Sequence, residues 1–257
     1  MAGRSGVLWW CMLCAFACCG RRTSASELTI FVENPGGEIL CENVTTFGQN
    51  IVISFERRDA SEVTVWYDYA NSVQIVKFLV SGEEELNQPG VTRTVCYAVY
   101  FDRDSMVPVN AMYKLRQRNA HAVRTAEMDK GREEMYFDTK LAAGSARELS
   151  AHLAELCVST NVVHTRQKDL QSWMNIFGDS RIARLQTTKV LLNPMQQVLC
   201  SSNPAPWAPC SCRLTSCVLW YPCALRFCEN NGVCGIRTCS KCYDMFHTED
   251  SALRCIE

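Results

Sequence analysis

The stretch IVISFERRDASEVTVWYDYANSVQIVKFLV, residues 51–80, decides the fold of the first part of the chain. Its three apolar runs at 51–55, 63–67 and 73–80 are rich in β-branched and aromatic residues, and polar or turn-forming segments separate them. Such runs predict strands, and the short connections between them favour antiparallel pairing. We therefore expect an antiparallel sheet to form the core of this region.

Two further apolar runs extend the predicted sheet on either side. The run LTIFV at 28–32 ends at a turn at 34–37, and a polar loop at 81–90 precedes a second run at 91–101. Both runs have the composition of strands, and both are bounded by residues that favour turns. Residues 27–100 together predict a sheet of about five strands.

The next region, residues 105–185, predicts helices. Pro108 suits the start of a helix because its fixed backbone angle matches the first turn. The sequence SARE at 145–148 matches the S-x-x-E capping box, and leucines at helical spacing follow it over 149–156. A second helix is expected over about 165–176. The predicted fold class is therefore α+β, with two main helices packed on the sheet.

The N-terminus matches a secretory signal peptide. Arg4 supplies the positive charge, residues 7–19 are an unbroken apolar run of thirteen, and small residues follow at 23–26. The run is shorter than the roughly 20 apolar residues that a membrane span needs. We expect a secreted, extracellular protein without a membrane anchor. The net charge of −1 predicts no nucleic-acid partner.

Cysteines mark the end of the chain as a different kind of region. Helical and strand periodicity is weak there, and ten of the seventeen cysteines are concentrated in it. A small module in an oxidising compartment favours disulfides over zinc, so no metal is expected. Its cysteines are Cys200, Cys210, Cys212, Cys217, Cys223, Cys228, Cys234, Cys239, Cys242 and Cys255. Their pairing cannot be read from the sequence.

The predicted organisation has four parts. Residues 1–26 are a signal peptide, 27–185 the first domain, 186–199 a linker and 200–257 a cysteine-rich C-terminal domain. This arrangement places a domain with its own core before a small module held by disulfides.

Three cysteines lie in the middle of the chain, which is an odd number. Cys96 falls in a predicted strand and Cys157 at the end of a predicted helix, so a bridge between them would clip the sheet to the helix. Such a crosslink typically contributes ~2–4 kcal/mol. Cys41 is then left over, and it could be a free thiol, link two chains into a covalent dimer, or disturb the even count of the tail.

Two further residues are candidate sites. Asn43 begins an N-V-T sequon, which in an exported protein predicts a glycan on a surface loop. Asp68 follows two aromatic residues inside a strand run, so it lies either on an exposed face or partly buried with a raised pKa and a switching role. No spacing typical of catalytic, metal or cofactor sites occurs, so we expect neither an enzyme nor a cofactor.

Four segments resemble a known family. They lie at 112–127, 164–173, 220–223 (WYPC) and 234–239 (CGIRTC), and they resemble the out at first protein family across about residues 27–255. The resemblance implies a secreted, developmental protein whose N-terminal domain is similar to BRICHOS domains and precedes the family's cysteine-rich domain. The cysteines at 41, 217 and 242 depart from the cysteine pattern that is usual in the family, and Cys217 with Cys242 would make an extra bridge.

The BRICHOS likeness can be placed on individual residues. These domains carry an Asp in one strand, a Cys in a later strand and a second Cys near the end of a helix, and the two cysteines bond. Asp68, Cys96 and Cys157 fill those places in order, with residues 81–90 as an insertion. The resemblance thus implies a Cys96–Cys157 disulfide and a functional role for Asp68.

The resemblance also implies two functions. BRICHOS domains act as chaperone-like modules, and a sheet face or edge can shield a β-prone segment that would otherwise template aggregation. The leading hypothesis is a non-enzymatic, secreted binder of extracellular β-prone polypeptides that acts near Asp68. The alternative is a developmental ligand or modulator that binds a receptor or matrix protein through its cysteine-rich tail.

Overall fold

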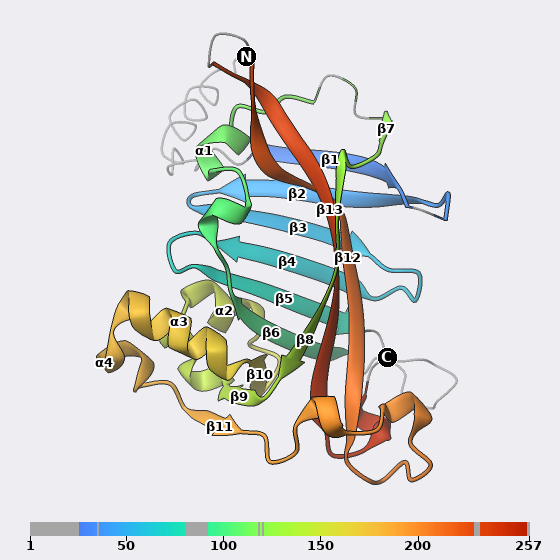
Figure 1. Cartoon of the computed structure of the whole chain (residues 1–257), viewed down its shortest axis with the longest axis vertical. Helices are drawn as coiled ribbons and strands as arrows, with labels where there is room; N and C mark the ends of the chain where they lie inside the picture. The colour runs from blue at the N-terminus through green and yellow to red at the C-terminus, as the bar shows by residue number, and fades with distance from the viewer. Residues whose placement is uncertain are drawn as a thin grey trace, which may run out of the picture.

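The computed structural model describes residues 26–34, 36–80, 92–117, 119, 121–228 and 232–255. The predicted signal peptide up to residue 25 and the predicted insertion at 81–90 lie outside the described residues. About half of the described chain belongs to two β-sheets that pack against each other (Figure 1).

The first sheet has ten strands in the described ranges, in the order β11-β9-β10-β6-β5-β4-β3-β2-β1-β7. Its centre is the antiparallel meander that the sequence predicted, and parallel pairing adds β7 to β1 and β10 to β6. The strands are β1 (Ser26–Glu33), β2 (Ile39–Phe47), β3 (Asn50–Glu56), β4 (Glu62–Asp68), β5 (Val73–Val80), β6 (Arg93–Tyr100), β7 (Val123–Arg124), β9 (Thr139–Ala142), β10 (Val162–Thr165) and β11 (Thr187–Lys189).

The predicted number of about five strands was therefore too low. Strand β2 was missed because a buried acid, Glu42, takes an inward position between exposed Cys41 and half-buried Asn43. Strands β9, β10 and β11 have only three or four residues each, which is too short for a periodic pattern. They form because pairing in series satisfies their backbone groups: β10 pairs with β6 of the meander, β9 with β10, and β11 with β9.

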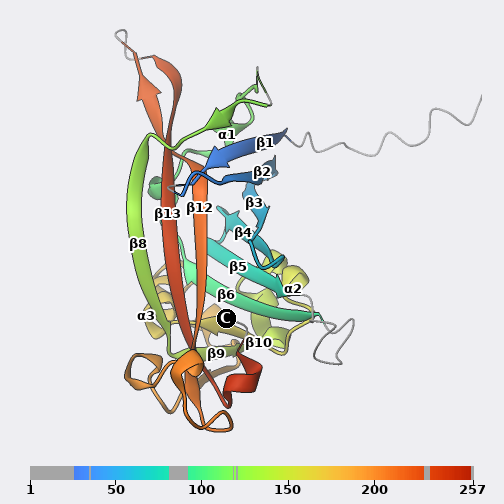
Figure 2. The same cartoon turned by 90° about the vertical axis from the view of Figure 1, so that its right-hand side faces the viewer.

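The second sheet has the order β12-β13-β8, with β8 (Met128–Phe137), β12 (Cys210–Phe227) and β13 (Val233–Glu249). The expectation of weak strand character in the tail was wrong, because β12 and β13 span 18 and 17 residues. Their frequent cysteines mask the strand pattern in the sequence. Figure 2 shows this sheet standing against one face of the first.

A single hydrophobic core fills the space between the two sheets. Ile51 and Ile53 on β3 and Val63 on β4 are fully buried, and they belong to the same cluster as Leu214 on β12 and Met245 on β13. Burial of apolar area is the main stabilising term in folding. The C-terminal hairpin therefore shares the apolar face of the meander.

The helices between residues 151 and 182 pack on the opposite face of β5 and β6, whereas the helix at residues 109–112 contributes to the core between the two sheets. Alternation along β6 sends Tyr97 toward the second sheet and Cys96 toward a separate cluster that contains Leu153 and Trp173. The helices are α1 (Val109–Met112), α2 (Ala151–Leu156), α3 (Gln167–Phe177) and α4 (Asp179–Ile182). Short 3-10 helices are η2 (Arg103–Ser105), η3 (Ala143–Glu148), η4 (Pro194–Gln196), η5 (Cys200–Ser202) and η6 (Ala252–Arg254).

The predicted capping box is wrong in position. Residues 145–148 belong to the 3-10 helix η3, and Ser150 is the N-cap of α2, where its hydroxyl accepts from the N–H of Leu153 at 3.4 Å. The same hydroxyl donates to the carboxylate of buried Asp68 at 2.7 Å. A contact with the sheet therefore selects the start of this helix over the local S-x-x-E pattern.

Six disulfides link described residues of the fold, and the ten tail cysteines pair among themselves. Cys96 and Cys157 join β6 to the end of α2, with their Cα atoms 6.1 Å apart. The tail bridges are Cys200–Cys210, Cys212–Cys255, Cys217–Cys242, Cys223–Cys239 and Cys228–Cys234. Cys41 is exposed and free within the described part of the chain. Among the helices of the described ranges, none is long and apolar enough to cross a membrane.

Candidate binding groove

The structure buries Asp68 between the sheet and the helices. Its carboxylate accepts hydrogen bonds from the Ser150 hydroxyl, from the backbone N–H of Asn71 at 3.1 Å and from the Asn71 side chain at 2.8 Å. The residue is 1% exposed, so the expected alternative of an exposed acid is wrong. These contacts tie β4 to the start of α2, and a role of Asp68 in binding stays a prediction.

Asn43 and Cys41 lie on β2 and point away from the second sheet. The sequon was expected in a loop, but it lies within the strand because Val44 and the threonines after it favour extended backbone. The Asn43 side chain accepts from the Thr29 hydroxyl at 3.1 Å. A glycan on Asn43 and a second chain bound to Cys41 would both have to use this face of β2.

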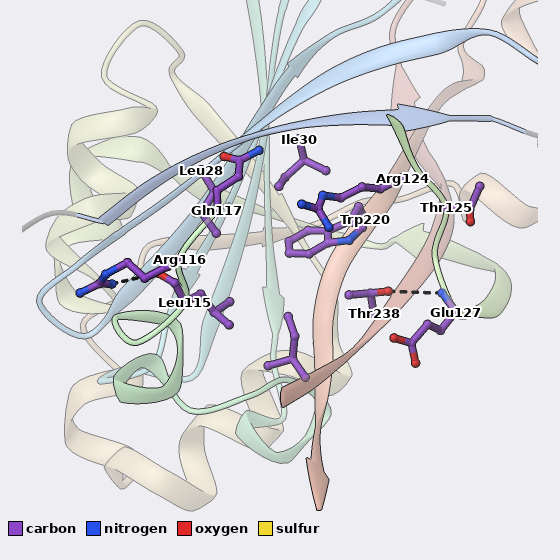
Figure 3. A pocket seen from close by; sticks show the side chains of 11 residues that line it. Leu28, Ile30, Leu115, Arg116, Gln117, Arg124, Thr125, Glu127, Trp220 and Thr238 are labelled. Carbon is purple, nitrogen blue, oxygen red and sulfur yellow. Dashed lines mark hydrogen bonds between the residues drawn. The ribbon is translucent and has the colours of Figure 1, made fainter. Parts of the chain in front are cut away.

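A groove of about 390 Å³ lies where three distant segments of the chain meet (Figure 3). One wall comes from β1, a second from residues 115–117 and 124–127, and the third from the β12–β13 hairpin. Its lining residues are Leu28, Ile30, Leu115, Arg116, Gln117, Arg124, Thr125, Glu127, Trp220, Ile236 and Thr238. It is absent from the sequence predictions because no local pattern brings these segments together.

The outer edge of β1 is only partly paired by backbone. β7 pairs with β1 at Phe31 and Val32 alone. At Thr29 the backbone N–H donates to Oε1 of Gln117 at 3.3 Å, and Nε2 of Gln117 donates to the Thr29 carbonyl. A side-chain amide carries the same donor and acceptor as a peptide group. Gln117 therefore occupies the place that a neighbouring strand would take.

The groove combines an apolar floor with basic side chains. Leu28 and Ile30 flank Thr29 on β1, point inward and are buried. Nε of Arg124 is buried and has no hydrogen-bond partner among the described residues. Glu127, by contrast, is paired with Arg226 at 2.6 Å. The groove thus offers apolar contacts beside a guanidinium that could donate hydrogen bonds to an acidic group.

A buried acid beside the groove was also missed. Glu42 on β2 is 1% exposed, and its carboxylate accepts from the N–H groups of Leu219 at 2.6 Å and Trp220 at 3.0 Å. A register shift between Val218 and Tyr221 frees these two donors from the ladder. Burial raises the pKa of Glu42 to about 7, although the two backbone hydrogen bonds oppose the shift.

The geometry defines a class of protein: two packed β-sheets held by disulfides, with a groove beside an incompletely paired strand edge. Residues 26–173 match the family described as Out at first, and residues 199–257 match Out at first, C-terminal. The chain therefore belongs to the out at first family, and the resemblance expected from its sequence is confirmed.

Two relatives show how far the similarity extends. The chain is 33% identical over 259 residues to the Out at first protein of Drosophila melanogaster, covering 93% of this chain and 53% of that protein. It is 34% identical over 257 residues to the Out at first protein of Drosophila virilis, covering 92% and 83%. This chain thus spans about half the length of the Drosophila melanogaster relative. No solved structure matches it.

Proposed function

We propose that this chain is an exported binding protein that takes up an extended polypeptide segment along the outer edge of β1. The observation that carries the proposal is the Gln117 amide, which fills both ladder positions of Thr29. A side chain is a weaker partner for an edge than a continuous strand, because it satisfies one residue only. An incoming strand could displace it and add to the sheet.

The groove adds selectivity to this backbone pairing. Side chains of an added strand would alternate, so those on one side would reach the apolar floor that includes Leu28 and Trp220. Arg124 would favour a segment with an acidic side chain next to its apolar ones. Six disulfides support a protein built for an oxidising compartment.

This mechanism gives a location to the chaperone-like activity that the BRICHOS likeness implies. A β-prone client paired with β1 would have one of its own edges occupied and could no longer template growth on that side. The binding site would lie at the sheet edge instead of at Asp68, which is covered by the helical layer. The activity is binding and involves no turnover.

The edge can be tested by three substitutions that leave the core untouched. Thr29→Pro removes the outward N–H and should abolish binding, because proline is tolerated at a sheet edge but cannot donate. Thr29→Ala keeps the N–H and is the matched control. Gln117→Ala vacates the edge and should strengthen binding.

The readout is the delay of fibril growth when the full chain is added at substoichiometric amounts to an amyloid-forming peptide. The proposal expects a delay with the wild type and Thr29→Ala, a longer delay with Gln117→Ala and none with Thr29→Pro. Equal protection by Thr29→Pro, with unchanged thermal unfolding, would place the activity elsewhere on the molecule.

An apolar surface at the other end favours a second candidate function, binding of a receptor or matrix protein through the tail. Its exposed side chains are Leu191, Leu192, Met195, Val198, Trp207 and Leu253. The backbone carbonyls of Leu192, Val198 and Pro206 accept hydrogen bonds from β13, β12 and the C-terminal segment, respectively, which holds these loops against the hairpin. Contiguous exposed apolar surface is typical of interaction sites.

The two candidates separate experimentally. Trp207→Ser combined with Leu191→Ser should abolish binding to cell surfaces if the tail surface contacts a partner, and should leave the fibril assay unchanged. Binding that survives this double substitution would rule out the tail surface.

A further inference from the structure

Two histidines and a glutamate meet at the end of the sheets remote from the β1 edge. His164 lies on β10, and His247 and Glu249 lie on β13. One nitrogen or oxygen atom from each residue falls within 4.8 Å of the other two. His247 and Glu249 are two positions apart on a strand, so their side chains share a face. The cluster therefore joins the first sheet to the second.

His247 is oriented in the way that metal-binding histidines are. Its Nδ1 lies 2.8 Å from the phenolic oxygen of Tyr97, and its Nε2 lies 3.2 Å from Oε1 of Glu249. In metal sites one ring nitrogen usually bonds to such an outer partner, which leaves the other nitrogen for the metal. Tyr97 fixes the ring of His247 so that Nε2 and the carboxylate converge on one point.

His164 supplies an imidazole nitrogen that lacks a protein partner. The residue is 6% exposed, and its Nδ1 is buried with no hydrogen-bond partner within the described part of the chain. The centroid of its ring lies 4.2 Å from that of His247. An imidazole nitrogen is the group through which histidine coordinates a metal.

We propose that His164, His247 and Glu249 form a Zn²⁺ site that links β10 to β13. Two imidazole nitrogens and one carboxylate oxygen match a three-ligand zinc site with one open coordination position. Zinc–ligand distances of about 2.1 Å place tetrahedral ligand atoms about 3.4 Å apart. The His247–Glu249 pair, at 3.2 Å, is already close to this separation. The ligand atom of His164 lies within 4.8 Å of the other two, so each of its distances would have to shorten by at most about 1.4 Å.

The site has both a path for the ion and a basis for selectivity. The Glu249 side chain is 20% exposed, whereas that of His247 is 2% exposed, so an ion would reach the cluster past the carboxylate. Calcium and magnesium prefer oxygen ligands and should bind poorly to two imidazoles. The sequence offered no signal for this site, because its ligands come from distant strands without a local metal-binding spacing.

Zinc binding can be measured on the full, oxidised chain without an affinity tag. The protein is stripped with a chelator and titrated with Zn²⁺ in competition with a chromophoric chelator. We expect one zinc per chain, and we expect Glu249→Gln and His164→Gln each to lower the affinity by about tenfold or more. His121→Gln, which changes an exposed histidine near the other end of the sheets, is the matched control and should bind like the wild type.

Cobalt gives a readout that is independent of affinity. Co²⁺ in the wild type should show the intense visible absorption of a tetrahedral ion, and Glu249→Gln should change it. Glu249→Gln decides the question if His164→Gln does not fold, since Glu249 is partly exposed. The proposal is overturned if the wild type binds no zinc against the competitor, if Glu249→Gln binds zinc like the wild type, or if Ca²⁺ or Mg²⁺ competes equally.

Discussion

Replacing Glu42 by glutamine should change how the stability of this protein depends on pH. The carboxylate lies in the core between β2 and the second sheet, where burial raises its pKa from 4.5 to about 7. In the unfolded chain the group ionises near its ordinary value. Between about pH 4.5 and 7 the folded state therefore holds a proton that the unfolded state has lost.

The sign and size of the effect follow from this difference. A folded state that binds more protons loses stability as pH rises. The unfolding free energy of the wild type should therefore fall through this window and become constant above it. The gap between 4.5 and about 7, at about 1.4 kcal/mol per pKa unit, gives about 3 kcal/mol. Glutamine does not titrate, so Glu42→Gln should lack this contribution.

The assay is urea unfolding of both proteins from pH 4.5 to pH 8 with the disulfides intact. Other titrating groups are shared, so the informative quantity is the difference in unfolding free energy between variant and wild type. The glutamine side chain can accept a hydrogen bond from only one of the two backbone N–H groups, which lowers the unfolding free energy of the variant by about 1–3 kcal/mol at every pH. The unfolding free energy of Glu42→Gln, taken relative to that of the wild type, should nevertheless increase by about 3 kcal/mol from low to high pH.

A matched control is Glu56→Gln, which changes an exposed acid at the end of β3. Its stability should follow the wild-type pH profile. Parallel profiles for Glu42→Gln and the wild type would refute the reasoning, because they would mean that Glu42 titrates alike in both states.

Two further predictions concern the helical layer. Cys157→Ser removes the bridge from β6 to α2 and should lower the free energy of unfolding by ~2–4 kcal/mol, with reduced export from cells; unchanged thermal unfolding and export would contradict this. Ser150→Ala removes both the N-cap of α2 and a partner of buried Asp68, so it should cost about 1–3 kcal/mol in urea unfolding. Ser159→Ala, at an exposed serine after α2, should be nearly neutral, and an equal loss there would show that the assay does not report the cap.

Part of the candidate site could be foreseen from the sequence, and part could not. The Cys96–Cys157 and Cys217–Cys242 bridges were expected, whereas the pairing of the other tail cysteines was left open. The strand character of 28–32 was evident from its composition. Gln117 could not be recognised, because its role depends on meeting Thr29 across 88 positions of the chain. Glu42 was hidden for a related reason, since a buried acid in a strand is recognisable only when its distant backbone donors are known.

The sequence by itself determined the meander and the disulfide character of the tail, because β-rich runs with short connections pair locally and cysteines can be counted. Only the tertiary structure decided that the tail forms long strands sharing a core with the meander, that Ser150 caps α2, and that Gln117 reaches the β1 edge. Those outcomes depend on apolar burial and hydrogen bonds between segments far apart in the chain, and local patterns carry no information about such contacts.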